Sequence, residues 1–174
     1  MDLGAVDRII ADAIGEPGMR TFYLQARAGA ELVTVVVEKE QVQLLATSVL
    51  ELLADVPRET AAGDDDALTL EEPVDPRWRA GRLSIGYEGD HDRFLLEVTE
   101  LEPEDEDPDD PRSASLGEPE VIRLWATREQ MLALSRHGAA VAERGRPTCQ
   151  FCGNPIDPEG HACPATNGHR TPRT

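Results

Sequence analysis

The chain has 174 residues, of which 40% are hydrophobic and only 4% aromatic, so it can build one domain with an aliphatic core plus an appendage. Its formal net charge of −17 argues against a general nucleic-acid-binding protein, because contacts to phosphates need a basic surface. The sequence has no apolar run near 18 residues, and from its first residues we expect no signal peptide. We therefore expect a cytoplasmic protein that does not bind membranes.

The charge is unevenly distributed along the chain. From Arg136 onward there are five arginines against three acidic residues, so the first 135 residues carry a net charge of −19. An acidic body is thus followed by a mildly basic tail. This tail leaves open a narrow role in nucleic-acid binding.

The first 56 residues predict strands followed by one helix. Residues 6–14 are apolar with interspersed acids and end at a turn, a pattern that fits either a helix or a strand. Residues 20–27 and 31–38 alternate between apolar and polar side chains on either side of a short turn, which indicates a hairpin. In residues 39–56 the apolar positions recur at threes and fours, which predicts a helix with one apolar face.

A second set of similar elements follows a polar segment, residues 57–76, that we expect to be a flexible linker. Residues 82–88 and 93–99 alternate around a turn and predict a second hairpin. Residues 102–119 are rich in Asp, Glu and Pro and are expected to be disordered. A short strand then leads into a second helix, which begins with a capping box of Thr127 and Gln130 and ends at 145–147.

The two sets resemble an internal repeat. Residues 20–24 parallel 92–96, and residues 39–42 parallel 128–131 at the start of each helix. If residues 8–14 correspond to 82–88, residues 6–14 form a strand. The alternative is a coincidence between two common ββα patterns.

The resulting prediction is an α+β fold. Its antiparallel sheet has about six strands, is built from two ββ(β)α repeats and carries both helices on one face. The predicted divisions are a first half (1–56), a linker (57–76), a second half (77–145) and a zinc-binding tail (146–174).

All three cysteines lie in the tail, where their spacing predicts a metal site. Cys149 and Cys152 form a Cys-x₂-Cys pair, and after eight residues His161 and Cys163 follow with one residue between them. Thiolates and imidazoles are preferred zinc ligands, and such a pair places two thiolates on one tight turn. Three cysteines cannot form a complete set of disulfides, which also favours a metal-bound, reduced state.

The fourth ligand has two candidates, His161 and His169. We favour His161, because the eight-residue spacer then closes a compact knuckle. Four protein ligands leave no position for a reactive water, so the predicted zinc ion, one per chain, has a structural role.

Two motifs carry a resemblance to a known family. Residues 18–25, Gly-x-Arg-Thr-Phe-Tyr-Leu-Gln, and residues 149–168, which contain Cys-x-x-Cys-Gly-Asn-Pro-Ile-Asp-Pro-Glu-Gly-His-x-Cys-Pro, resemble an uncharacterised family widespread in actinobacteria. The resemblance implies a bacterial cytoplasmic protein with a domain of unknown function, and it supplies no reaction.

Three functional hypotheses remain open. No catalytic motif stands out, so the first is a non-enzymatic protein-interaction or regulatory module with an unidentified protein partner. The second is an enzyme of unrecognised type that acts on a nucleotide or small metabolite between the two halves. The third is weak nucleic-acid binding through the tail arginines, namely Arg144, Arg146, Arg170 and Arg173.

Overall fold

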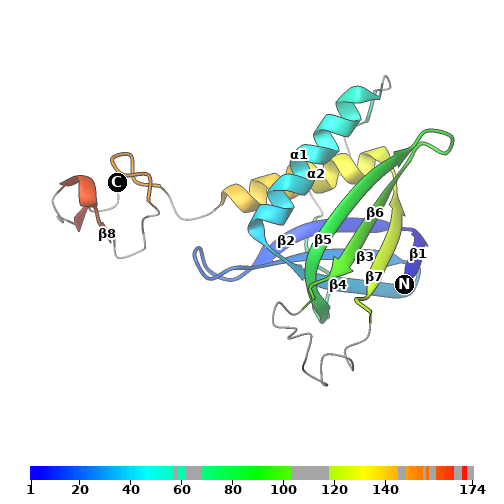
Figure 1. Ribbon diagram of the computed structural model, residues 1–174, viewed down its shortest axis with the longest axis horizontal. Coiled ribbons are helices and arrows are strands. Elements are labelled where there is room, and N and C mark those ends of the chain that lie inside the picture. Colours follow the sequence, from blue (N-terminus) through cyan, green and yellow to red (C-terminus); the bar gives the residue numbers. More distant parts are fainter. Residues whose placement is uncertain are drawn as a thin grey trace, which may run out of the picture.

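The computed structural model describes residues 1–56, 59–61, 68–102, 118–144, 148–154, 156, 160–166 and 170–171. In this part of the chain a seven-stranded sheet packs against two helices, and a small hairpin lies in the tail (Figure 1). The predicted α+β class is confirmed. The elements are β1 (Asp2–Ala5), β2 (Arg8–Ile14), β3 (Thr21–Ala28), β4 (Glu31–Val37), α1 (Lys39–Asp55), β5 (Pro76–Glu88), β6 (Arg93–Glu100), β7 (Val121–Ala126), α2 (Arg128–Glu143), β8 (His161–Ala162), the 3₁₀ turn η3 (Pro164–Thr166) and β9 (Arg170–Thr171).

Several predictions fall outside the described residues. These are most of the acidic segment (103–117), parts of the linker (57–58 and 62–67), and the candidates Arg146, His169 and Arg173. Within the described residues, no helix combines the length and apolar character needed to cross a membrane.

The sheet is mixed rather than antiparallel, which corrects the prediction. Its strand order is β1-β7-β6-β5-β4-β3-β2, and the β4–β5 and β1–β7 pairs are parallel. The two hairpins were visible in the sequence because alternating strands flank a turn. Parallel neighbours have no such turn between them, so nothing local in the sequence marks either join.

The two parallel joins have the same geometry. At one, Pro76 and Arg79 of β5 pair with residues 34 and 36 of β4. At the other, Asp2 and Ala5 of β1 pair with residues 123 and 125 of β7. In each, three steps along one strand match two along the other, which is the signature of a β-bulge. The first strand of each half therefore begins beside the last strand of the other half and then turns to pair with its own.

Each helix starts directly after a strand, with a glutamine at its third position. In α2 the predicted capping box is present: Gln130 N donates to Thr127 Oγ1 (3.1 Å), and Thr127 N donates to Gln130 Oε1 (2.8 Å). In α1 the amide of Glu38 donates to Gln41 Oε1 at 2.7 Å. These bonds satisfy amides that have no partner inside the helix.

The same two glutamines hold the bends of the crossing strands. Gln130 Nε2 donates to the carbonyls of residues 6 and 7, at 2.9 and 3.0 Å, where β1 passes into β2. Gln41 Nε2 donates to the carbonyls of residues 80 and 81 in β5, both at 3.1 Å. Carbonyls that leave the sheet ladder at a bend need another partner, and one side chain supplies it in each half.

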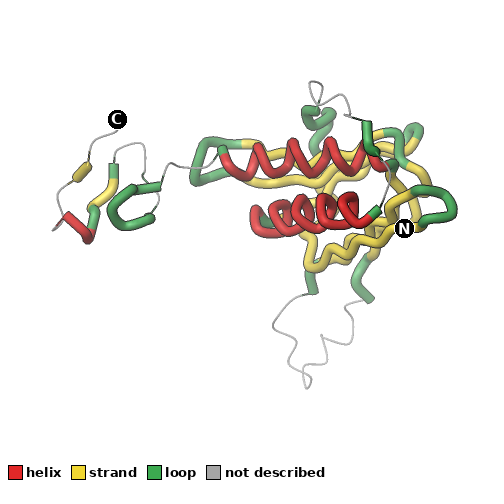
Figure 2. Tube along the Cα trace, turned by 90° about the horizontal axis from the view of Figure 1, so that it is seen from above, coloured by secondary structure: helices red, strands yellow, loops and turns green. Residues whose placement is uncertain are grey.

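The core lies on the inner face of the curved sheet. Side chains of the two halves face each other there and leave a void of only about 10 Å³ between Leu24, Ala26, Val33, Val35, Val98, Ile122 and Leu124. Figure 2 shows both helices side by side over the same side of the sheet. Gly138 allows α2 to approach closely, because a Cβ atom there would lie 3.0 Å from Val42 Cγ1 and 3.5 Å from Ala11 Cβ.

The segment predicted as a linker makes specific contacts at Glu71. Its carboxylate forms ion pairs with Arg8 (3.1 Å) and Arg27, and its backbone exchanges two hydrogen bonds with buried Gln25 (2.7 and 2.9 Å). The hydrogen bond from Arg27 lowers the pKa of Glu71 and raises that of Arg27. Residues 68–71 therefore lie against the first half of the sheet.

The clamping role of the two glutamines predicts a loss of stability when either is removed. We expect Gln130→Ala and Gln41→Ala each to lower the free energy of unfolding by about 1 to 3 kcal/mol, because each leaves two carbonyls and one amide without partners. Urea denaturation measures the difference. The exposed Gln43 on α1 is the matched control, and Gln43→Ala should change stability by about 0.5 kcal/mol or less. Equal losses in all three variants would contradict the clamping role.

Candidate metal centre

The first two candidate ligands lie on a tight turn of the tail. Gly153 N donates to the carbonyl of Cys149, and Cys149 N donates to the carbonyl of Asn154, both at 2.8 Å. Gly153 has a φ of +73°, a left-handed conformation that glycine adopts without strain. The turn therefore presents the side chains of Cys149 and Cys152 together.

The other two candidates come from the short hairpin. His161 lies in β8, opposite Thr171 of β9, and Cys163 follows the strand directly. The ligand atoms of Cys149, Cys152, His161 and Cys163 all lie within 4.8 Å of one another. All four residues predicted from the spacing are thus brought together, whereas His169 lies outside the described residues.

Two of the distances between ligand atoms are close to those of a tetrahedral metal site. Cys149 Sγ and Cys163 Sγ are 3.8 Å apart, and Cys152 Sγ is 3.2 Å from His161 Nε2. With zinc–sulfur bonds of about 2.3 Å, two sulfurs on a tetrahedron lie about 3.8 Å apart, and a sulfur and a nitrogen about 3.5 Å apart. The cysteines are not joined by disulfides. The arrangement is therefore suited to coordinating one small cation.

Two of the four candidate ligands are buried, and the other two are half-buried. Cys149 and Cys163 are 4% and 0% exposed, while Cys152 and His161 are half-buried. His161 Nε2 lies 3.2 Å from Cys152 Sγ, while Nδ1 is buried without a hydrogen-bond partner among the described residues. Nε2 is accordingly the nitrogen available to a metal.

Backbone amides tune the two thiols of the turn differently. The pKa of Cys149 is lowered, chiefly because the amide of Phe151 donates a hydrogen bond to its sulfur. The amide of Asn154 acts in the same direction on Cys152, but burial and the nearby sulfurs of Cys163 and Cys149 raise the pKa of Cys152 overall. The neighbouring sulfurs thus favour ionisation of Cys149 and oppose that of Cys152, and a bound divalent cation would remove that opposition. These amide donors are a part of the site that the sequence showed only indirectly, through Gly153.

The tail arginines are only partly described. Arg144 is exposed at the C-cap of α2, where its amide bonds the carbonyl of Ala140 at 3.2 Å. The side chain of Arg170 is not described, and Arg146 and Arg173 lie outside the described residues. The nucleic-acid hypothesis therefore stays a prediction.

One comparison with known proteins gives a match. The family model described as a protein of unknown function (DUF3090) matches residues 1–163, which include the sheet, both helices and all four candidate ligands. This finding confirms the predicted resemblance to an uncharacterised family, while its distribution in actinobacteria stays a prediction. No curated protein and no solved structure matches the chain.

The left-handed glycine predicts how the turn responds to substitution. We expect Gly153→Val to weaken binding of a divalent metal about tenfold, because a side chain in this conformation costs about 1 to 2 kcal/mol. Titration against a chelating dye measures the affinity. Phe151→Ala is the matched control on the same turn, since that side chain is 58% exposed and its amide is retained. Equal affinities of the two variants would contradict a role for the Gly153 conformation.

Proposed function

The chain belongs to the DUF3090 family of proteins of unknown function, and we propose that it is a non-enzymatic interaction or regulatory module with one structural zinc ion. The ligands are Cys149, Cys152, His161 and Cys163. The observation that carries this proposal is the approach of these four ligand atoms to within 4.8 Å of one another. We place the protein in the cytoplasm, where reduced cysteines are the rule.

Zinc is the metal that this ligand set favours. Three thiolates and one imidazole are soft to borderline donors, which suit zinc far better than magnesium or calcium. A Cys₃His set fills all four positions of a tetrahedron. No position remains for a water or a substrate, which supports a structural rather than a catalytic ion.

The described part of the tail contains only short elements. Its strands β8 and β9 have two residues each, and η3 has three. So short a segment cannot bury enough apolar surface to offset its conformational entropy. In comparable small sites the metal supplies about 10 kcal/mol or more of folding free energy. On this proposal the tail folds around zinc and presents a rigid surface that includes the exposed Phe151.

The body adds a second element to the proposal, namely that its halves are copies of one βββα unit. The shared bulge at both parallel joins and the shared glutamine clamps support this interpretation. A coincidence between two common patterns explains a hairpin and a helix in each half. Such a coincidence explains less well why each half has a glutamine that bonds the carbonyls at the corresponding strand bend.

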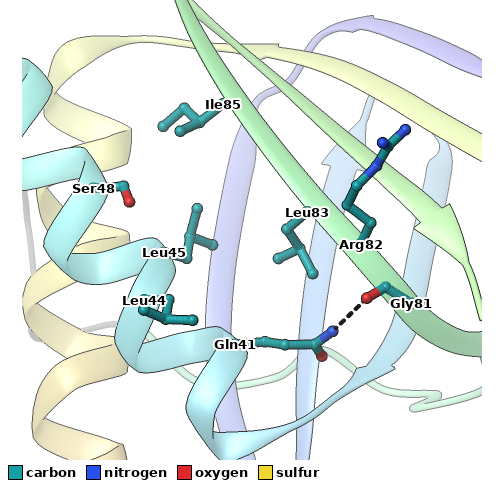
Figure 3. Close-up of a pocket in the computed structure, with 8 residues that line it drawn as sticks. All are labelled: Gln41, Leu44, Leu45, Ser48, Gly81, Arg82, Leu83 and Ile85. Carbon is teal, nitrogen blue, oxygen red and sulfur yellow. Dashed lines mark hydrogen bonds between the residues drawn. The ribbon is translucent and has the colours of Figure 1, made fainter.

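An enzyme acting between the halves is the less favoured alternative. The cavity between α1 and β5, drawn in Figure 3, has a volume of about 240 Å³. Ligand pockets usually span about 300 to 1,000 Å³ and contain several convergent polar groups. Half of the residues that line this cavity are leucine or isoleucine, and its one charged residue is Arg82. Its small size and apolar lining argue against a catalytic site in this cavity.

The zinc proposal predicts the metal content of the protein and of three variants. Protein purified without chelators should contain one zinc per chain, and Cys149→Ser and His161→Ala should lose it because each removes a ligand. Elemental analysis measures the content. His169→Ala is the matched control and should keep its zinc. If His169→Ala loses the metal and His161→Ala retains it, the proposed ligand set is wrong.

The interaction proposal predicts that a partner depends on the folded tail. We expect at least one protein to co-purify with the wild-type chain and to be lost with a Cys149→Ser/Cys163→Ser variant, because the tail unfolds without zinc. Circular dichroism should show that the variant retains its sheet. Identical sets of proteins on both baits would contradict the proposal. Binding of DNA or RNA that weakens steeply with salt would instead favour the nucleic-acid alternative.

A further inference from the structure

The space between α1 and β5 is an apolar groove at the surface, here called the α1–β5 groove. Its wall includes Gln41, Leu44, Leu45, Arg82, Leu83 and Ile85. Figure 3 shows Leu45, Leu83 and Ile85 extending into the space between helix and strand, while Arg82 extends from the opposite side of β5. Leu44 is 68% exposed at the mouth. One exposed leucine is ordinary, but one beside a groove of further apolar side chains marks a candidate docking surface.

The groove has a counterpart between α2 and β2. We treat a residue of β2 or α2 as corresponding to one of β5 or α1 when both lie the same number of residues from the strand bend or from the glutamine that bonds it. Arg8 directly follows the bend held by Gln130, as Arg82 follows the bend held by Gln41. Both cavities are lined by the glutamine, the arginine and the apolar residue after it, which is Ile9 in the counterpart.

In the counterpart, the chain itself supplies part of the wall. Leu68 lines the cavity together with Ile9 and Ala133. Three residues later, Glu71 reaches Arg8 with 3.1 Å between Oε1 and Nη1. The short segment 68–71 thus places a leucine on the helix side of β2 and a carboxylate on its arginine.

The α1–β5 groove shares the glutamine, the arginine and the apolar strand residue, but among the described residues no such segment lines it. Residues 82–88 of β5 pair with β6 on one side, while the pairing with β4 ends at Arg79, so their other edge is free among the described residues. Arg82 is exposed and makes no ion pair within the described part of the chain. At the position of the buried Ala133, α1 carries the exposed Leu44.

We propose that the α1–β5 groove docks an extended segment of a partner protein that carries a leucine-like side chain followed, three residues later, by a carboxylate. The leucine-like side chain packs against Leu44, Leu83 and Ile85. The segment then crosses the free edge of β5, and its carboxylate pairs with Arg82. The chain's own residues 68–71 are the template for this occupant. This surface is separate from the zinc tail.

The test uses a fluorescent peptide with the sequence of residues 68–75 as the probe, and the full-length, zinc-loaded chain as its receptor. Anisotropy titration should show saturable binding. Leu44→Asp should weaken binding about tenfold, because a charged side chain replaces apolar contact. Arg82→Glu should weaken it about threefold, as expected for an exposed ion pair. A peptide with lysine in place of its glutamate at position 71 should regain affinity for Arg82→Glu.

The matched control is Leu50→Asp, a change at a residue on α1 that is 45% exposed and does not line the groove. It should bind the peptide like the wild type. The proposal is overturned if the peptide does not bind, or if Leu44→Asp binds as tightly as Leu50→Asp. Self-association of the wild type that Leu44→Asp abolishes in sedimentation would also overturn it, by assigning the groove to a second copy. Zinc content measured on the same samples keeps this result separate from the fate of the tail proposal.

Discussion

The fold depends on two strands that each serve both halves of the sheet. β1 pairs with β7 and continues into β2, which pairs with β3, while β5 pairs first with β4 and then with β6. A strand that changes partners must bend, and the bend frees carbonyls that the sheet ladder no longer satisfies. Gln41 and Gln130 satisfy them from the first turn of each helix. The same hydrogen bonds therefore stabilise the bends of the strands and fix the start of each helix beside them.

The interactions expected to stabilise the tail differ from those that stabilise the body. In the body, apolar side chains such as Phe94 and Leu96 are fully buried, and the hydrophobic effect stabilises the fold. The tail has strands of only two residues, and the best-buried side chains among its described residues are the thiols of Cys149 and Cys163. A bound cation would stabilise the thiolate forms of cysteines that lie this close together. The body is thus expected to fold without metal, and the tail to depend on it.

Local patterns in the sequence predicted the parts of the structure that have local causes. The alternation of apolar and polar residues around turns predicted the hairpins, and the spacing of apolar residues predicted α1. The comparison with residues 82–88 identified β2 as a strand. The four candidate ligands were found because a tetrahedron restricts their spacing. β1 and the start of β5 were missed, since their partners are far away in the chain. The contacts of Glu71 were missed for the same reason, because Arg8 and Arg27 look like ordinary surface charges.

The differences between the halves carry the functional argument. At the α2–β2 contact, the small residues Gly138 and Ala11 allow the helix to pack closely against the strand. At the corresponding place in β5 stands Ile85, and the larger side chain there accompanies a groove instead of a close contact. The exposed Leu44 beside this apolar groove contributes little to the stability of the sheet. Among the described residues, segment 68–71 lines the first cavity, whereas the second cavity has a glutamine and an arginine at the matching places and no such segment. This asymmetry is why we assign partner binding to the second groove.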